Sequence, residues 1–165
     1  MRDNIRGSIV AVITIAMLPA VAVLRAQNDP LIGHWVLDAA KSKYEGTAMP
    51  RSEMRVYEAF GGVGKGIKGT FDRVDAQGKR IHVTYAAMYD GKDYKYDGPE
   101  GDTIALAHPN ANTLDATLKR NGKVVQTTHS VISADGKTRT QIATGTDAEG
   151  HKITLTAVFV KQTTS

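Results

Sequence analysis

The sequence predicts an all-β protein, an up-and-down antiparallel β-barrel of about 8–10 strands. The first observation is a series of Gly-containing turns, each between two runs of β-forming residues. Asn-Gly and Asp-Gly pairs in such places are the strongest short-range signal for a β-hairpin. The second observation is that no stretch with helical periodicity is longer than the apolar N-terminal segment, so no helix is expected to cover the sheet. A closed barrel buries the apolar face of the meander against itself, and a two-sheet β-sandwich is the alternative.

The expected strands are runs rich in Val, Thr, Ile and Tyr, bounded by turn residues. In chain order they are 33–38, 51–60, 66–75, 79–89, 93–97, 102–107, 113–120, 123–133, 137–146 and 151–161. Residues 39–44 are expected to form at most a helical turn, because Gly46 and Pro50 break anything longer.

Several of these runs alternate between apolar and polar residues, as strands with one buried face do. In the run 79–89 the residues expected on the inner face are Ile81, Val83, Tyr85, Ala87 and Tyr89. His82 falls on the opposite face of that run and is expected to be exposed. The runs 113–120 and 151–161 alternate in the same way. This pattern predicts a sheet with one wet face and one face in a core.

Residues 1–26 have the layout of a secretory signal peptide. Two arginines precede the apolar stretch 9–18, and small residues follow at Ala22 and Ala26. Cleavage after Ala26 leaves 27–165 as a single barrel domain, with cleavage after Ala22 and an uncleaved membrane anchor as alternatives. We therefore expect a periplasmic or secreted protein whose only contact with a membrane is through an uncleaved leader.

The chain has no cysteine and carries a formal net charge of +4. Without the leader, which contains Arg2, Arg6, Arg25 and Asp3, 18 basic and 16 acidic residues remain, a net charge of +2. The two signs are interspersed, so no nucleic-acid partner is expected. The lack of cysteine excludes thiol catalysis and thiolate metal ligands, and a domain without disulfides depends on its core for stability.

The tripeptide Gly33-His34-Trp35 stands at the start of the first expected strand. A Gly-x-Trp there, followed by about ten strands, resembles the lipocalin and fatty-acid-binding-protein superfamily. The segments 40–43 and 135–138 are similar to those of small exported bacterial lipocalin-like proteins of unassigned role. The resemblance implies that Trp35 closes the barrel base and stacks on a cation near the last strand, for which Lys161 is the candidate. Such a stack contributes about 0.5–2 kcal/mol. The helical lid and the disulfides found in parts of this superfamily are not evident here.

The sequence contains no motif that assigns catalysis, a metal or a cofactor. The glycine-rich stretch 61–69 matches a dinucleotide fingerprint in spacing, but residues 70–74 predict a strand where that motif needs a helix. The acidic stretch 90–102 fails the ligand pattern of an EF-hand. The five histidines have no i, i+2 or i+4 spacing, and no Gly-x-Ser-x-Gly occurs.

Aromatic residues in the middle of the expected strands are candidates for lining a ligand cavity. They are Tyr57, Phe71, Tyr85 and Tyr89. A tyrosine combines an apolar ring with a polar tip, which suits an amphipathic ligand.

Three polar residues in the middle of strands complete the candidate set. Arg55 and Arg139 must either point outward or meet an anion. In related barrels an inward arginine holds a ligand carboxylate, and the resemblance gives Arg139 this role. His129 alternates with Val125, Thr127 and Val131 and is a candidate for an inward-pointing side chain, as a core residue or a ligand contact.

Three functions remain open, because a fold does not decide a function. The first is a monomeric exported barrel that binds a small hydrophobic or amphipathic molecule in a cavity of roughly a few hundred Å³, without a cofactor. The second is a filled barrel with a role at its surface. The third is a hydrolase or isomerase at the barrel mouth, in which His129 or His82 meets a carboxylate inside the barrel.

Overall fold

A computed structural model describes residues 29–147 and 149–163 of the chain. Within these residues the chain forms eleven strands and one short 3-10 helix, η1. In order they are β1 (Gly33–Leu37), η1 (Ala39–Lys41), β2 (Lys43–Glu45), β3 (Ser52–Ala59), β4 (Gly66–Val74), β5 (Arg80–Met88), β6 (Tyr94–Gly98), β7 (Gly101–Asn110), β8 (Thr113–Arg120), β9 (Lys123–Ile132), β10 (Thr138–Thr146) and β11 (Lys152–Lys161). The predicted leader, residues 1–26, lies outside the described residues.

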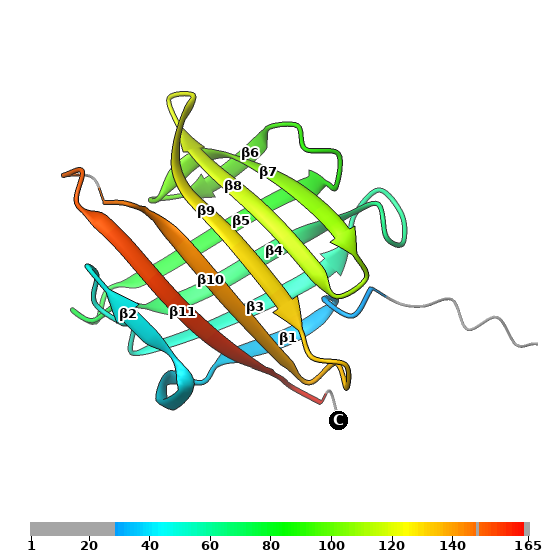
Figure 1. The fold of residues 1–165 in the computed structure, drawn as a ribbon, viewed down its shortest axis with the longest axis horizontal. Helices are drawn as coiled ribbons and strands as arrows, with labels where there is room; N and C mark the ends of the chain where they lie inside the picture. The colour runs from blue at the N-terminus through cyan, green and yellow to red at the C-terminus, as the bar shows by residue number, and fades with distance from the viewer. Residues whose placement is uncertain (1–28, 148, 164–165) are drawn as a thin grey trace, which may run out of the picture.

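The strands form a closed antiparallel up-and-down barrel, which confirms the predicted fold class (Figure 1). From β3 to β11 each strand pairs with the next one along the chain, and β1 pairs with both β3 and β11. Ten of the described strands make the barrel, and β2 is an extra strand that pairs with β11 alone. We call the end where β1 begins and β11 ends the base, and the opposite end the mouth.

The turn between β8 and β9 shows why the Asn-Gly signal was informative. Asn121 has a φ of 50° and Gly122 a φ of 74°. A two-residue hairpin turn whose twist matches that of its strands needs positive φ at both central residues. Asn and Gly tolerate this conformation better than other residues do, so the pair fixes the hairpin.

Alternation along the strands places one set of side chains in the barrel interior. In β5, Val83, Tyr85 and Ala87 are buried, whereas Arg80 and His82 are exposed. This confirms the expected two-faced strand. Most of the strands contribute interior side chains to one hydrophobic core.

The segment after β1 differs from the expected helical turn. Only Ala39–Lys41 is helical, and the chain then returns to the sheet as β2. The Ser42 hydroxyl donates to the carbonyl oxygen of Asp38 at 2.7 Å and accepts the backbone N–H of Val158 at 2.9 Å. These bonds fasten the turn to β11, so Lys43 can pair with Thr156 of that strand.

None of the helices in residues 29–147 and 149–163 has the length and apolar character needed to cross a membrane.

Candidate functional site

The base of the barrel is closed by Trp35, which is fully buried. Its indole N–H donates to the carbonyl oxygen of Leu31 at 2.8 Å. The Nζ of Lys161 lies 5.2 Å from the centroid of the Trp35 ring and donates to the carbonyl oxygen of Pro30 at 2.8 Å. Gly33 is required beside it, because a Cβ there would lie 2.8 Å from Cε of Lys161, and its φ of +128° favours glycine. The structure therefore brings Gly33, Trp35 and Lys161 together as expected, and burial lowers the pKa of Lys161.

Further from the base, the side chains enclose an inner chamber of about 110 Å³. Strands β2 to β11 all contribute to its walls, and the lining mixes aromatic, aliphatic and charged groups. The charged residues are Glu53, Arg55, Arg73, Glu100 and Arg139. An apolar cavity of about 150 Å³ can hold benzene. The inner chamber therefore has room for a polar group and a few atoms beyond it, but not for a whole ligand.

Arg55 is fully satisfied inside the barrel. Its Nη2 lies 2.6 Å from Oε1 of Glu53, and its Nη1 donates to Oε1 of Gln141 at 2.7 Å. The guanidinium lies between two rings, 4.5 Å from the centroid of Phe71 and 4.4 Å from that of Phe159. Burial is the largest single effect and opposes the charge, but Glu53 and Tyr57 together outweigh it, so the pKa of Arg55 is raised. Arg55 is thus a structural cation of the core.

Arg139 points into the barrel and is only 2% exposed. Its Nη1 donates to the hydroxyl of Tyr57, and its Nη2 donates to Oγ of Ser130 at 3.0 Å. Its Nε is buried and has no hydrogen-bond partner among the described residues. Buried polar atoms are nearly always paired, so this guanidinium is incompletely satisfied.

The charges around the inner chamber leave Arg139 without a counter-ion. Glu53 pairs with Arg55, and Glu100 pairs with Arg73. In the part of the chain that the structure describes, no carboxylate forms an ion pair with Arg139. A buried charge without a partner is costly, so the chamber suits an added anion.

An aromatic row covers the wall of the barrel from β3 to β6. The ring of Phe71 lies 5.6 Å from Tyr57 and 5.6 Å from Tyr85, edge to face in both cases. Tyr85 stacks on Tyr96 at 6.1 Å. Gly69 leaves room for this row, since a Cβ there would lie 2.6 Å from Cζ of Tyr85. The wall offers flat apolar surfaces edged with hydroxyl groups.

Three tyrosine hydroxyls of this interior, those of Tyr44, Tyr85 and Tyr96, remain protonated over the ordinary pH range. Burial raises the pKa of Tyr44 to about 12, helped by the negative charge of Glu53. Burial also raises the pKa of Tyr85 and of Tyr96. Each of these groups can therefore donate a hydrogen bond at neutral pH.

A wider chamber of about 480 Å³ opens at the mouth. It shares with the inner chamber a set of side chains that we call the boundary ring: Tyr44, Arg73, Glu100, Leu118, Gln126 and Leu155. Arg73 and Glu100 form an ion pair on this ring, and the hydroxyl of Tyr96 donates to Oε2 of Glu100 at 3.0 Å. Burial opposes the charge on Arg73, but Glu100 outweighs it and raises the pKa of Arg73. A ligand with its polar end in the inner chamber would extend through this ring into the mouth.

Three of the predicted aromatic residues, Tyr57, Phe71 and Tyr85, line the inner chamber. Tyr89 does not. Its hydroxyl donates to Oδ2 of Asp29 at 2.6 Å, and its ring lies 4.5 Å from that of His108. It belongs to the base, because it stands at the base end of its run.

The expectation that His129 points inward is wrong, because Thr127, His129 and Val131 lie on the exposed face of β9, and a bulge puts Val125 out of step with them. Leu118 pairs with Gln126, but Lys119 pairs with Val124, so Val125 is an extra residue in the ladder. The bulge shifts the alternation, and Val125 therefore does not share a face with His129. His129 is exposed, and its Nδ1 lies 2.6 Å from Oδ1 of Asp115 on the outer surface.

The third alternative required a histidine–carboxylate pair inside the barrel, and the described residues place none there. No histidine lines the inner chamber there. His82 does have a carboxylate partner, Asp72, with Nδ1 2.7 Å from Oδ1, but this side chain is 62% exposed on the outer face. The histidine–aspartate pairs of β4–β5 and β8–β9 thus lie outside the site.

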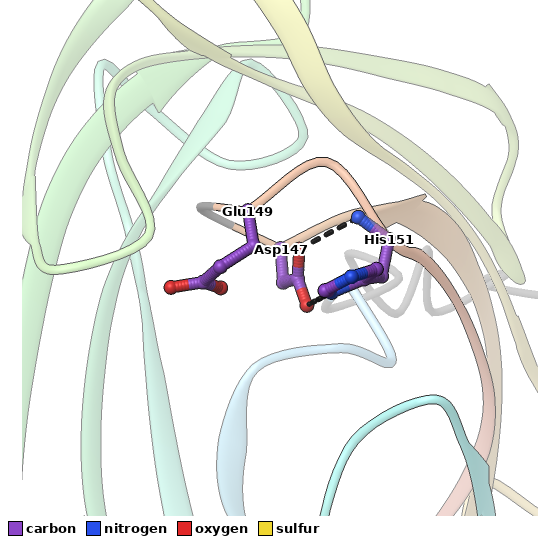
Figure 2. A group of neighbouring side chains, drawn as sticks. All are labelled: Asp147, Glu149 and His151. Atoms are coloured by element: carbon purple, nitrogen blue, oxygen red, sulfur yellow. Dashed lines mark hydrogen bonds and ion pairs between the residues drawn. The ribbon is translucent and has the colours of Figure 1, made fainter.

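Sequence reasoning missed one group of metal-ligating residue types, because it considered the acidic stretch 90–102 and the spacing of histidines but not a turn that mixes Asp, Glu and His. Asp147, Glu149 and His151 each have a ligand atom within 4.8 Å of the others, in the turn between β10 and β11. Figure 2 shows Asp147 between the other two, with both of its bonds directed to His151. Nδ1 of His151 lies 2.9 Å from Oδ2 of Asp147, and the His151 backbone N–H donates to Oδ1 at 2.8 Å. These bonds account for the turn, and we assign no ion to it.

Comparison with known proteins adds no assignment to this geometry. No family model and no curated protein matches the chain. The fold therefore rests on the structure, and the site rests on the residues described above.

Proposed function

We propose that the protein is a binding module that holds a small amphipathic molecule inside the barrel, with its anionic group at Arg139. The single observation that carries this proposal is the buried Arg139 guanidinium, which faces the inner chamber without a carboxylate partner and with an unpaired Nε. A carboxylate suits this position, because it accepts two hydrogen bonds from the fork of an arginine.

The two chambers support this orientation of the ligand. The inner chamber is small and mixes aromatic and aliphatic walls with a few charged groups, and the mouth chamber is wider and reached through the boundary ring. Aromatic walls with a few convergent polar groups are typical of small-molecule sites. The apolar part of the ligand would therefore lie along Tyr85 and Tyr96 and extend toward the mouth.

The resemblance to the lipocalin and fatty-acid-binding-protein superfamily agrees with this proposal. The base with Gly33, Trp35 and Lys161 has the geometry that the resemblance implies. We also propose, from the leader-like residues 1–26, that the protein is exported to the periplasm or secreted and acts as a monomer.

Native mass spectrometry of gently purified protein tests the proposal directly. A small molecule that accompanies the folded protein and is lost on denaturation is the expected result. Arg139→Met should weaken binding of the anionic fluorophore anilinonaphthalene sulfonate about tenfold or more, because a charge-assisted hydrogen bond is lost. Arg80→Met removes an exposed arginine of β5 and should leave binding unchanged.

A bare protein mass, together with no fluorescence response to this fluorophore or to a panel of fatty acids and retinoids, would contradict the proposal. The same result would favour the filled barrel, in which ordered water satisfies Arg139 and function resides on the outer surface.

A further inference from the structure

The strand β6 is the least supported strand of the barrel. It pairs with β5 only at Thr84–Asp97 and Tyr85–Tyr96. By contrast, β4 pairs with β5 along its whole length, from Gly66–Met88 to Val74–Arg80. On its other side β6 meets β7 through a shifted register between Lys95 and Gly98. Figure 1 shows β6 as a short strand beside the longer β5 and β7.

At the mouth end, β5 correspondingly lacks a paired strand on one side in the described ladder. In the described ladder, residues 80–83 pair with β4 on one side and with no strand on the β6 side. The β6–β7 ladder ends at the pair Gly98–Gly101, and Pro99 and Glu100 form the turn beyond it. Side chains of other strands add to the hold on this turn.

Two arginines hold the turn from opposite sides. Arg73 of β4 forms the ion pair with Glu100, and Arg120 of β8 donates to the carbonyl oxygen of Pro99. Tyr96 adds its hydrogen bond to Glu100 at 3.0 Å. The side chains of Arg73 and Glu100 are 27% and 29% exposed, so water can compete for their pair.

The position of this turn gives it a role in access. Arg73 and Glu100 both belong to the boundary ring that separates the inner chamber from the mouth chamber. If the turn moves outward, the ring loses Glu100, and Arg73 of β4 loses its ion-pair partner. The aromatic wall at Tyr96 would then be reached from the mouth.

We propose that the β6–β7 turn is a flap that controls access to the inner chamber, and that the Arg73–Glu100 ion pair is its latch. This inference rests on the proposed function of the inner chamber as a ligand site. The flap opens when the side-chain bonds at its tip break. Few ladder hydrogen bonds of β6 have to break at the same time, so this local opening is accessible. An exposed or half-exposed ion pair contributes little free energy, so the latch can open readily.

Hydrogen exchange of the unliganded protein tests the flap without any ligand. Glu100→Gln removes the charge of the latch and keeps the size of the side chain. We expect the amides of residues 94–101 to exchange about two- to fivefold faster, which is the factor that a surface ion pair supports. Arg73→Gln should produce the same local increase and serves as a second variant.

Glu58→Gln is the matched control. It breaks the ion pair between Glu58 of β3 and Lys68 of β4, which lies near the base of the barrel. Exchange in residues 94–101 should not change in this variant. Unchanged exchange of residues 94–101 in both latch variants, or an equal increase in the control, would overturn the flap.

Stopped-flow binding of anilinonaphthalene sulfonate separates the flap from the function. Glu100→Gln should raise the association rate two- to fivefold, while Glu58→Gln leaves it unchanged. Faster binding in both variants, or in neither, would overturn the role of the latch in access. If the fluorophore does not bind to any variant while exchange in residues 94–101 still rises, the proposed ligand site fails and the mobile turn stands.

Discussion

The buried pair of Glu53 and Arg55 permits a quantitative test of how the barrel interior is held together. Arg55→Met leaves the Glu53 carboxylate 3% exposed and without a cation. Removing one partner of a buried ion pair costs about 3–5 kcal/mol, because the remaining charge stays buried. Glu53→Leu should cost a similar amount, since Arg55 would keep only Gln141 and the faces of Phe71 and Phe159.

The double variant Glu53→Leu/Arg55→Met should lose far less free energy of unfolding than the two single variants lose together. Replacing a whole buried ion pair by apolar residues of similar volume is often close to neutral. We expect a loss of about 0–2 kcal/mol for the double variant, and therefore a coupling energy of at least about 3 kcal/mol.

Urea unfolding at pH 7, followed by the fluorescence of Trp35, measures all four free energies. Glu58→Gln, which breaks an exposed ion pair, is the control and should cost at most about 1 kcal/mol. The reasoning would be refuted if the Glu53 and Arg55 single variants each lost less than about 1 kcal/mol of unfolding free energy. It would also be refuted if the double variant lost the sum of the two single losses.

Three further predictions concern the base, the mouth and a turn. Gly33→Ala should destabilise the protein by about 1–3 kcal/mol in urea unfolding and change the emission of Trp35, because positive φ is strained and Cβ displaces Lys161. Folding raises the pKa of Tyr44 to about 12, so this hydroxyl contributes fully to stability below pH 10, and the contribution is lost as the pH rises toward 12. The decrease in the free energy of unfolding between pH 8 and pH 11 should therefore be smaller in Tyr44→Phe than in the unchanged protein. Asn121→Ala should cost about 1 kcal/mol by thermal unfolding and Asn121→Gly almost nothing, because φ at this position is 50°.

Much of the fold was predictable because hairpins are encoded locally. Turn residues and alternation are read within about ten residues, so all ten expected strands exist with small differences at their ends. The strand β2 was missed because nothing within residues 39–44 indicates that Ser42 will bond to Val158 of the last strand. That contact depends on the closed barrel.

The site was less predictable, because its decisive features are non-local. The bulge at Val125 depends on pairing between β8 and β9 and takes Val125 off the face that it was expected to share with His129. The sequence left open whether Arg55 and Arg139 point inward. The structure shows both inside, and the contrast between them arises because Glu53 meets Arg55 and no carboxylate meets Arg139 in the described part of the chain.

The pairing of β1 with β11 has a consequence for the order of folding. Trp35 and Lys161, which pair across the seam, lie near opposite ends of the chain, and β11 is also the partner of β10 and β2. The barrel therefore cannot close during synthesis until β11 has emerged from the ribosome. Until then, the hairpins that form earlier have an unpaired edge strand. Long-range pairing of this kind slows folding, because the loop it closes is long. Deletion of β11 would remove a partner from three strands at once, β1, β10 and β2, so loss of this strand should abolish the fold rather than trim it.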